Sequence, residues 1–437
     1  MKILINSLKI NKLFLKNAYS NFFFFNNYTI LIKLLITLFL FLTFTYVFYF
    51  SLKNIVNYWT YSEIHINYSL GFVKRGLLGS VMLYLESIGL SKNIFFSSIF
   101  YLTTICNIFL FLNLINKFKQ NHLFFFVFFS LNPALILFSF YDLGGYARTE
   151  IFGISICLLH TFFAQKFYHH KIDYKKYLKL LLTVIYPLSL IIILIHELNI
   201  LFLTFHFFTT LIILNKNKFR EVVNFKYLII INVIFLIFIT SLLLTHPFSK
   251  EFAQKLYDNL QSKDGTSFWI WASIAGTFSE RINSEINHML IPSGAISLYF
   301  FIFLFYLMPI FFLLNKTSEK NKFYLIYIFL SALPFVLLFF IGRDWGRWIH
   351  IIIFVIFCCL IQFKEKKINI PENYKFKILT YLFLIFIVFQ FGFTRIPHCC
   401  NLVKLNLDIF GGILPKVQVF YKMLNNDFDI KKRFQTY

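Results

Sequence analysis

The densest group of residues that could do chemistry is the segment from Gly342 to His350, which reads GRDWGRWIH. Arg343 and Arg347 are four residues apart, so a helix would place them on one face, and Asp344 could orient one of them or act as a base. Arginine carries a planar fork of donors that fits a phosphate or a carboxylate. This spacing therefore predicts that Arg343 and Arg347 bind an anionic group.

Two tryptophans, Trp345 and Trp348, lie in the same segment. Their flat rings could stack against a sugar, and we predict that role for both. Tryptophan is also enriched where a membrane meets water, and this aromatic belt is the commoner explanation of such residues.

A second basic pair, Lys74 and Arg75, lies in the glycine-rich stretch GFVKRGLLG. Glycines let a backbone approach a ligand closely, and the free amides at the start of a helix attract an anion. We predict that Lys74 and Arg75 bind phosphate, although contact with anionic lipid headgroups would explain them as well. On the same loop, Glu63 is a candidate general base.

Two further polar sites interrupt apolar segments. Arg148, in the sequence YDLGGYARTE, lies at the start of a predicted span, where an ionisable group usually has a ligand or a partner such as Asp142. His196 and Glu197 separate two long apolar stretches, near the hydrocarbon boundary. Burial there disfavours charge, so Glu197 and then His196 are candidate bases. The alternative is a hairpin turn that simply needs polar residues.

These sites are set in a strongly apolar chain. It has 437 residues, of which 59% are hydrophobic and only 14% are charged, and this composition excludes a soluble globular protein. A helix of about 20 apolar residues crosses a bilayer, and lipid-facing segments must be helical to pair their amides. The apolar runs suitable for spanning a membrane are 29–50, 93–116, 122–140, 149–165, 178–195, 199–214, 227–245, 289–314, 324–341, 350–363 and 378–394. We therefore predict an all-α polytopic integral membrane protein, one domain over 1–437, with about 11 transmembrane helices.

The connecting segments predict the orientation. With residues 1–28 in the cytoplasm, the inner loops are short and rich in lysine, as the positive-inside rule requires. The larger loops 51–92 and 246–288, both with interfacial helices, and the tail 395–437 then lie outside. Seven of the eight arginines fall on this outer side, against the usual bias. Together they could hold a lipid that carries a pyrophosphate, although ion pairs with neighbouring Glu and Asp or contacts with lipid headgroups would explain any single arginine as well.

Other ligands are not expected from the sequence. The net charge of +23 comes mostly from lysines in the short loops, so nucleic acid is not a predicted partner. The six cysteines lack metal-ligand spacing, and we predict neither a metal nor a cofactor.

This layout resembles that of the O-antigen and capsular repeat-unit polymerases of the bacterial inner membrane. The first span with its long outer loop 51–92, and the sequence YARTE at the outer start of a later span, are similar to the GT-C class of glycosyltransferases. Both resemblances imply glycosyl transfer from a polyprenyl-(pyro)phosphate carrier, within a membrane of lipids, during envelope glycan assembly. They imply a base, Glu197 or His196, and cations on the leaving phosphate.

Two other classes of protein remain open. A transporter or flippase of a lipid-linked glycan would place ionisable residues deep in several spans. The predicted span interiors are nearly free of charge, with Lys33 as an exception, which favours surface chemistry. A membrane scaffold would have no use for the clustered arginines.

Overall fold

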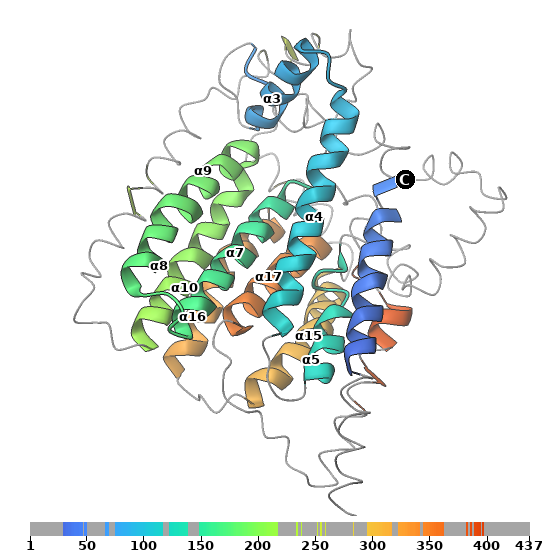
Figure 1. Ribbon diagram of the computed structural model, residues 1–437, viewed down its shortest axis with the longest axis vertical. Coiled ribbons are helices and arrows are strands. Elements are labelled where there is room, and N and C mark those ends of the chain that lie inside the picture. The colour runs from blue at the N-terminus through green and yellow to red at the C-terminus, as the bar shows by residue number, and fades with distance from the viewer. Residues whose placement is uncertain are drawn as a thin grey trace, which may run out of the picture.

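The computed structural model describes most of residues 29–49, then 66–69, 75–116, 122–138, 148–216, 295–316, 322–340 and 344–361, with scattered positions in 233–283 and 382–396. All regular structure in these residues is helical (Figure 1). The predictions for residues 1–28, for most of 246–288 and for almost all of the tail 395–437 concern segments outside the described residues.

Four described helices are long and apolar enough to cross a membrane. They are Thr29–Tyr46, Lys92–Asn116 (α4), Glu150–Tyr168 (α7) and the continuous helix Tyr174–Ile195. The all-helical class is thus confirmed and the apolar helices support a membrane protein, whereas the count of about 11 spans is not confirmed.

The last of these four is irregular, and the structure describes other helices besides. The helix from Tyr174 consists of α8 (Tyr174–Leu180), a π-helical turn η3 (Leu181–Ile185) and α9 (Tyr186–Ile195). The others are α3 (Gly76–Ser87), α5 (His122–Ser130), η4 (Glu197–Leu201), α10 (Phe202–Lys216), α15 (Ala295–Lys316), α16 (Lys322–Ala332), η7 (Leu333–Phe340) and α17 (Trp345–Ile361). The α3 helix confirms the helix predicted within the loop 51–92.

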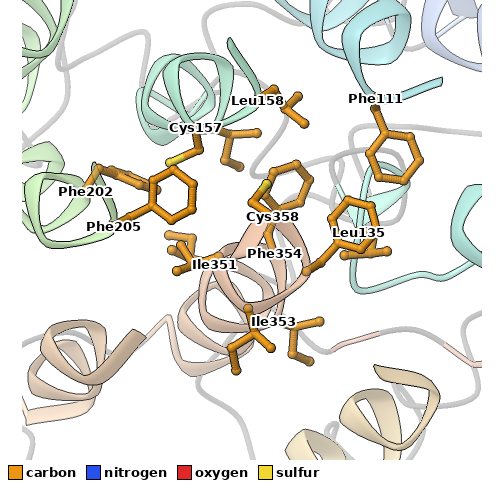
Figure 2. Close-up of a cluster of buried hydrophobic side chains, with 14 of the residues drawn as sticks. Phe111, Leu135, Cys157, Leu158, Phe202, Phe205, Ile351, Ile353, Phe354 and Cys358 are labelled. Carbon is orange, nitrogen blue, oxygen red and sulfur yellow. The ribbon is translucent and has the colours of Figure 1, made fainter. Parts of the chain in front are cut away.

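The centre of the bundle is α17, which is buried along almost its whole length and is apolar on all sides from Ile351 onward. A helix of that kind needs neighbours all around it. Those neighbours include α4, α7 and α10, as Figure 2 shows for the side chains of Phe111, Cys157, Leu158, Phe202, Phe205, Phe354 and Cys358.

The helices α7 and α17 run in the same direction. At their first turns Arg347 Nη2 lies 3.5 Å from Glu150 Oε1, and near their last turns Gln165 Nε2 donates to the carbonyl of Ile361 at 2.9 Å. The helix α10 runs antiparallel to α16, because Thr204 contacts the carbonyl of Ser331 near the end of α16.

This arrangement places the lysines and the arginine–carboxylate groups toward opposite ends of the bundle. The lysine-rich connection after α7, the end of α10 at Lys216 and the start of α16 at Lys322 all lie at one end of the bundle. The first turns of α7 and α17, with their arginines and carboxylates, lie toward the opposite end, where α3 also lies (Figure 1).

Irregular backbone surrounds the first turns of α7 and α17. Residues 131–137 form buried turns, and the carbonyl of Ala134 there accepts from Nδ1 of His350 at 2.8 Å. The protein thus satisfies part of the polar backbone of these turns with its own side chains.

Candidate functional site

The first part of the site is an ion pair between Arg75 and Glu197, which are 122 positions apart in the chain. Arg75 Nη2 lies 2.6 Å from Glu197 Oε1, and Arg75 Nε lies 2.8 Å from Glu197 Oε2. Arg75 is buried and Glu197 is only 18% exposed, so this bidentate contact is shielded from bulk water. Glu197 is therefore the carboxylate that holds Arg75.

The backbone at Arg75 is left-handed, with φ 67° and ψ 4°, directly before α3 begins at Gly76. This conformation costs a residue with a side chain roughly 1 to 2 kcal/mol. A strained residue that carries a buried charge is typical of a functional site, because glycine would fit the backbone better.

His196 ends α9 and begins η4. Its backbone is extended, with φ −157°, and its Nδ1 atom accepts from the amide of Leu198 at 3.2 Å. The same Nδ1 atom lies 3.8 Å from Glu197 Oε2. His196 thus caps the 3-10 turn that presents Glu197, and the predicted break in the chain at this position is confirmed.

The second part of the site lies at the start of α17. Arg347 Nη2 lies 2.9 Å from Asp344 Oδ2 and 3.5 Å from Glu150 Oε1, and the guanidinium stands 4.2 Å from the centre of the Trp348 ring. Asp344 thus orients Arg347, as the spacing predicted. Two carboxylates and an aromatic face hold this one cation in place.

Glu150 is the first residue of α7 and is 4% exposed. Neither of its carboxylate oxygens has a hydrogen-bond partner among the described residues, although Arg347 is close. Arg148, a predicted phosphate ligand, is half-buried two residues earlier. The positive end of the α7 dipole adds to the attraction between these cations and an anion.

The two parts of the site meet along the first turns of α7. Gly153, one turn after Glu150, packs so closely on the segment after Glu197 that a Cβ atom there would lie 2.3 Å from the Phe202 ring and 2.8 Å from Asn199 Oδ1. Glycine is required for this approach. It brings the η4 turn, which presents Glu197, against the helix that begins with Glu150.

The tryptophans predicted to stack on a sugar are core residues. Trp345 and Trp348 are 3% and 2% exposed. The indole of Trp345 donates to the carbonyl of Phe339 at 3.1 Å and packs edge-on against Tyr299. Both rings thus help to anchor α17 in the bundle, and their predicted stacking on a sugar stays a prediction.

Three predicted site residues, Glu63, Lys74 and Arg343, lie outside the described residues. Lys74 directly precedes Arg75, and Arg343 directly precedes Asp344. The structure therefore brings together Arg75, Glu197 and His196, and separately Arg347 and Asp344, with Arg148 nearby. Their predicted roles stay predictions.

One polar group was missed by the sequence reasoning. His160 of α7 and His206 of α10 share a hydrogen bond between their Nδ1 atoms at 2.9 Å, and His160 Nε2 lies 2.8 Å from the hydroxyl of Tyr177 in α8. All three are fully buried. The rule that ionisable groups inside a span usually have a function or a partner singles out each histidine, but it does not select the other histidine as the partner.

Within the part of the chain that the structure describes, no group of three or more His, Cys, Asp or Glu side chains could hold a metal ion. Comparison of the chain with known protein families, with curated proteins and with solved structures finds no match. Any functional assignment therefore rests on the residues and their geometry.

Proposed function

We propose that this protein transfers a sugar or an oligosaccharide from a polyprenyl-(pyro)phosphate carrier, at the outer face of the bacterial inner membrane, in envelope glycan assembly. The reaction would be of the kind carried out by O-antigen and capsule polymerases or by GT-C glycosyltransferases. The observation that carries the proposal is the gathering of buried arginines and carboxylates, Arg75 with Glu197 and Arg347 with Glu150, around the first turns of α7.

The reaction needs a carboxylate as well as cations. A hydroxyl of the acceptor attacks the anomeric carbon of the donor, and the carrier phosphate leaves with the bonding electrons. A carboxylate near the hydroxyl takes up its proton, and cations stabilise the charge on the leaving phosphate. A guanidinium has five donors, so Arg75 and Arg347 could hold a carboxylate and a phosphate at the same time.

The distribution of charge supports the outer side as the place of reaction. Lysine-rich connections lie at the end of the bundle opposite the arginine–carboxylate pairs. Since basic loops are retained in the cytoplasm, this separation favours an outward-facing site and a cytoplasmic N-terminus.

A transporter or flippase of a lipid-linked glycan is the second candidate. One observation favours it: the buried pair of His160 and His206 inside the bundle. Polar groups inside spans are typical of transporters.

Reconstitution separates these candidates. The protein is placed in liposomes with a labelled polyprenyl-pyrophosphate oligosaccharide, and both chain length and sidedness of the label are measured. We expect longer product. Movement of the label without new glycosidic bonds would support the flippase instead, and the absence of both would support a scaffold.

Substitution of the cations tests the site itself. We expect Arg347→Gln to lower the rate of transfer by about 10²-fold, because removal of one group that stabilises developing charge has an effect of that order. The control is Lys92→Gln, since Lys92 pairs with Glu86 away from the site. Equal rates for the two variants, at equal protein levels, would contradict the assignment.

A further inference from the structure

The structure contains a buried carboxylate whose hydrogen-bonding capacity is unused. Both oxygens of Glu150 are shielded from solvent and lack a hydrogen-bond partner within the described residues. Among the described residues, the carboxylate contacts Arg347 at 3.5 Å, which is too long for a good hydrogen bond. Buried polar groups are normally hydrogen-bonded, so this carboxylate keeps the capacity to accept a hydrogen bond from a donor.

We propose that Glu150, and not Glu197, accepts the proton of the attacking hydroxyl; the inference deepens the proposed function and rests on it. Glu197 is a poor candidate because the guanidinium of Arg75 occupies both of its oxygens at 2.6 Å and 2.8 Å. A carboxylate held in this way is stabilised as the anion and has little capacity left to take up a proton. Glu197 acts instead as a positioning residue for Arg75.

Two neighbouring amides also have unused acceptors. Asn107 donates through Nδ2 to the carbonyl of Ile151 at 3.3 Å, and Asn199 donates through Nδ2 to the carbonyl of Ile192 at 3.0 Å. These bonds fix the orientation of both amides, since a carbonyl can only accept. The Oδ1 atoms of Asn107 and Asn199 then remain buried acceptors without a partner in the described residues.

These acceptors lie beside the same turns of α7. Asn107 contacts the residue after Glu150, and the Asn199 oxygen packs against Gly153. Buried acceptors without a partner in the described residues are therefore gathered around the first turns of α7, where Glu150 lies.

The chemical step balances as follows. The hydroxyl oxygen of the acceptor forms a bond to the anomeric carbon, and the bond from that carbon to the phosphate oxygen breaks. The bonding electrons leave on the phosphate, next to the arginines. The hydroxyl proton passes to a carboxylate oxygen of Glu150 and is later lost to water.

The test compares three variants in the reconstituted transfer assay over a range of donor concentrations. We expect Glu150→Gln to lower the maximal rate by 10² to 10⁴-fold, because the base is gone. Glu197→Gln should act mainly by weakening donor binding. Glu86→Gln, an exposed carboxylate paired with Lys92, should match the wild type.

The outcomes are distinguishable. If the wild type forms no product, the proposed function fails. If the wild type is active and the maximal rate of Glu150→Gln stays within fivefold of it, the role of Glu150 is overturned. Should Glu150→Gln fail to fold, Glu150→Asp decides, since it keeps the charge and withdraws it by one methylene: a drop of 10-fold or more is expected, and an unchanged rate would overturn the inference.

Discussion

The ion pair of Arg75 and Glu197 should be the most strongly coupled pair of charges in the described structure. Removal of one member leaves the other charge buried without its partner. For fully buried pairs this costs 3 to about 5 kcal/mol of unfolding free energy, whereas replacement of both members by apolar residues of similar size is often nearly neutral.

The magnitude follows from the exposure of the two side chains. Arg75 is 7% exposed and Glu197 is 18% exposed, so some water reaches the carboxylate and the lower end of the range applies. We expect Arg75→Met and Glu197→Leu each to cost about 2 to 3 kcal/mol. The double variant should cost no more than either single variant, which corresponds to a coupling energy of about 2 to 3 kcal/mol.

The assay is equilibrium unfolding of the purified protein in mixed micelles, followed by helical circular dichroism. The reference pair is Lys92 and Glu86, where Glu86 is 52% exposed although the charged atoms lie 2.6 Å apart. An exposed pair contributes at most about 1 kcal/mol, so its coupling should be several times smaller. A coupling energy below about 0.5 kcal/mol for Arg75 and Glu197 would show that their contact does not hold α3 against the bundle.

Two further predictions concern packing inside the bundle. Gly153→Val should destabilise the protein by about 2 to 3 kcal/mol, because the added methyl groups overlap the buried ring of Phe202; the same unfolding assay measures this, and a neutral effect would mean that the close contact is absent. His160→Leu should cost about 1 to 3 kcal/mol, because it leaves the Nδ1 atom of His206 without its partner and removes one hydrogen bond of the Tyr177 hydroxyl, which keeps Thr210 as a partner. A smaller penalty for His160→Leu combined with His206→Leu than for the single change would support the network, and simple additivity would argue against it.

The helical class of the protein could be predicted from composition alone. Long apolar runs without charge admit only helices in a membrane, and the described chain is helical. Local features were also accessible: the glycines and apolar residues after Arg75 predicted α3, and the polar pair at His196 predicted the break that separates α9 from η4. Such features depend on neighbouring residues and can be identified from the sequence.

The partners of the charged residues could be predicted only in part. Asp344 was expected to orient one of its neighbouring arginines, because three positions on a helix bring side chains together. The contacts of Arg75 with Glu197 and of Arg347 with Glu150 join distant segments, and no spacing rule selects those partners. The unused hydrogen-bonding capacity of Glu150 depends on its burial. The sequence around a single charged residue at a span boundary does not show how deeply that residue is buried.

The histidine pair escaped prediction for a related reason. His160 and His206 each lie alone within an apolar run, so neither disturbs the pattern of its own helix. Their significance comes from the packing of α7 against α10, which places the two rings in contact. Polar contacts between spans of this kind require the three-dimensional arrangement.

The central claim is that the arginine–carboxylate end of the bundle faces outward, and labelling of single cysteines tests it most directly. Ser91 precedes α4 near that end, Lys171 follows α7 at the lysine-rich end, and both are exposed. In intact spheroplasts, a membrane-impermeant maleimide should react with Ser91→Cys, and with Lys171→Cys only after permeabilisation. The reverse pattern would place the site in the cytoplasm and contradict glycosyl transfer at the outer face.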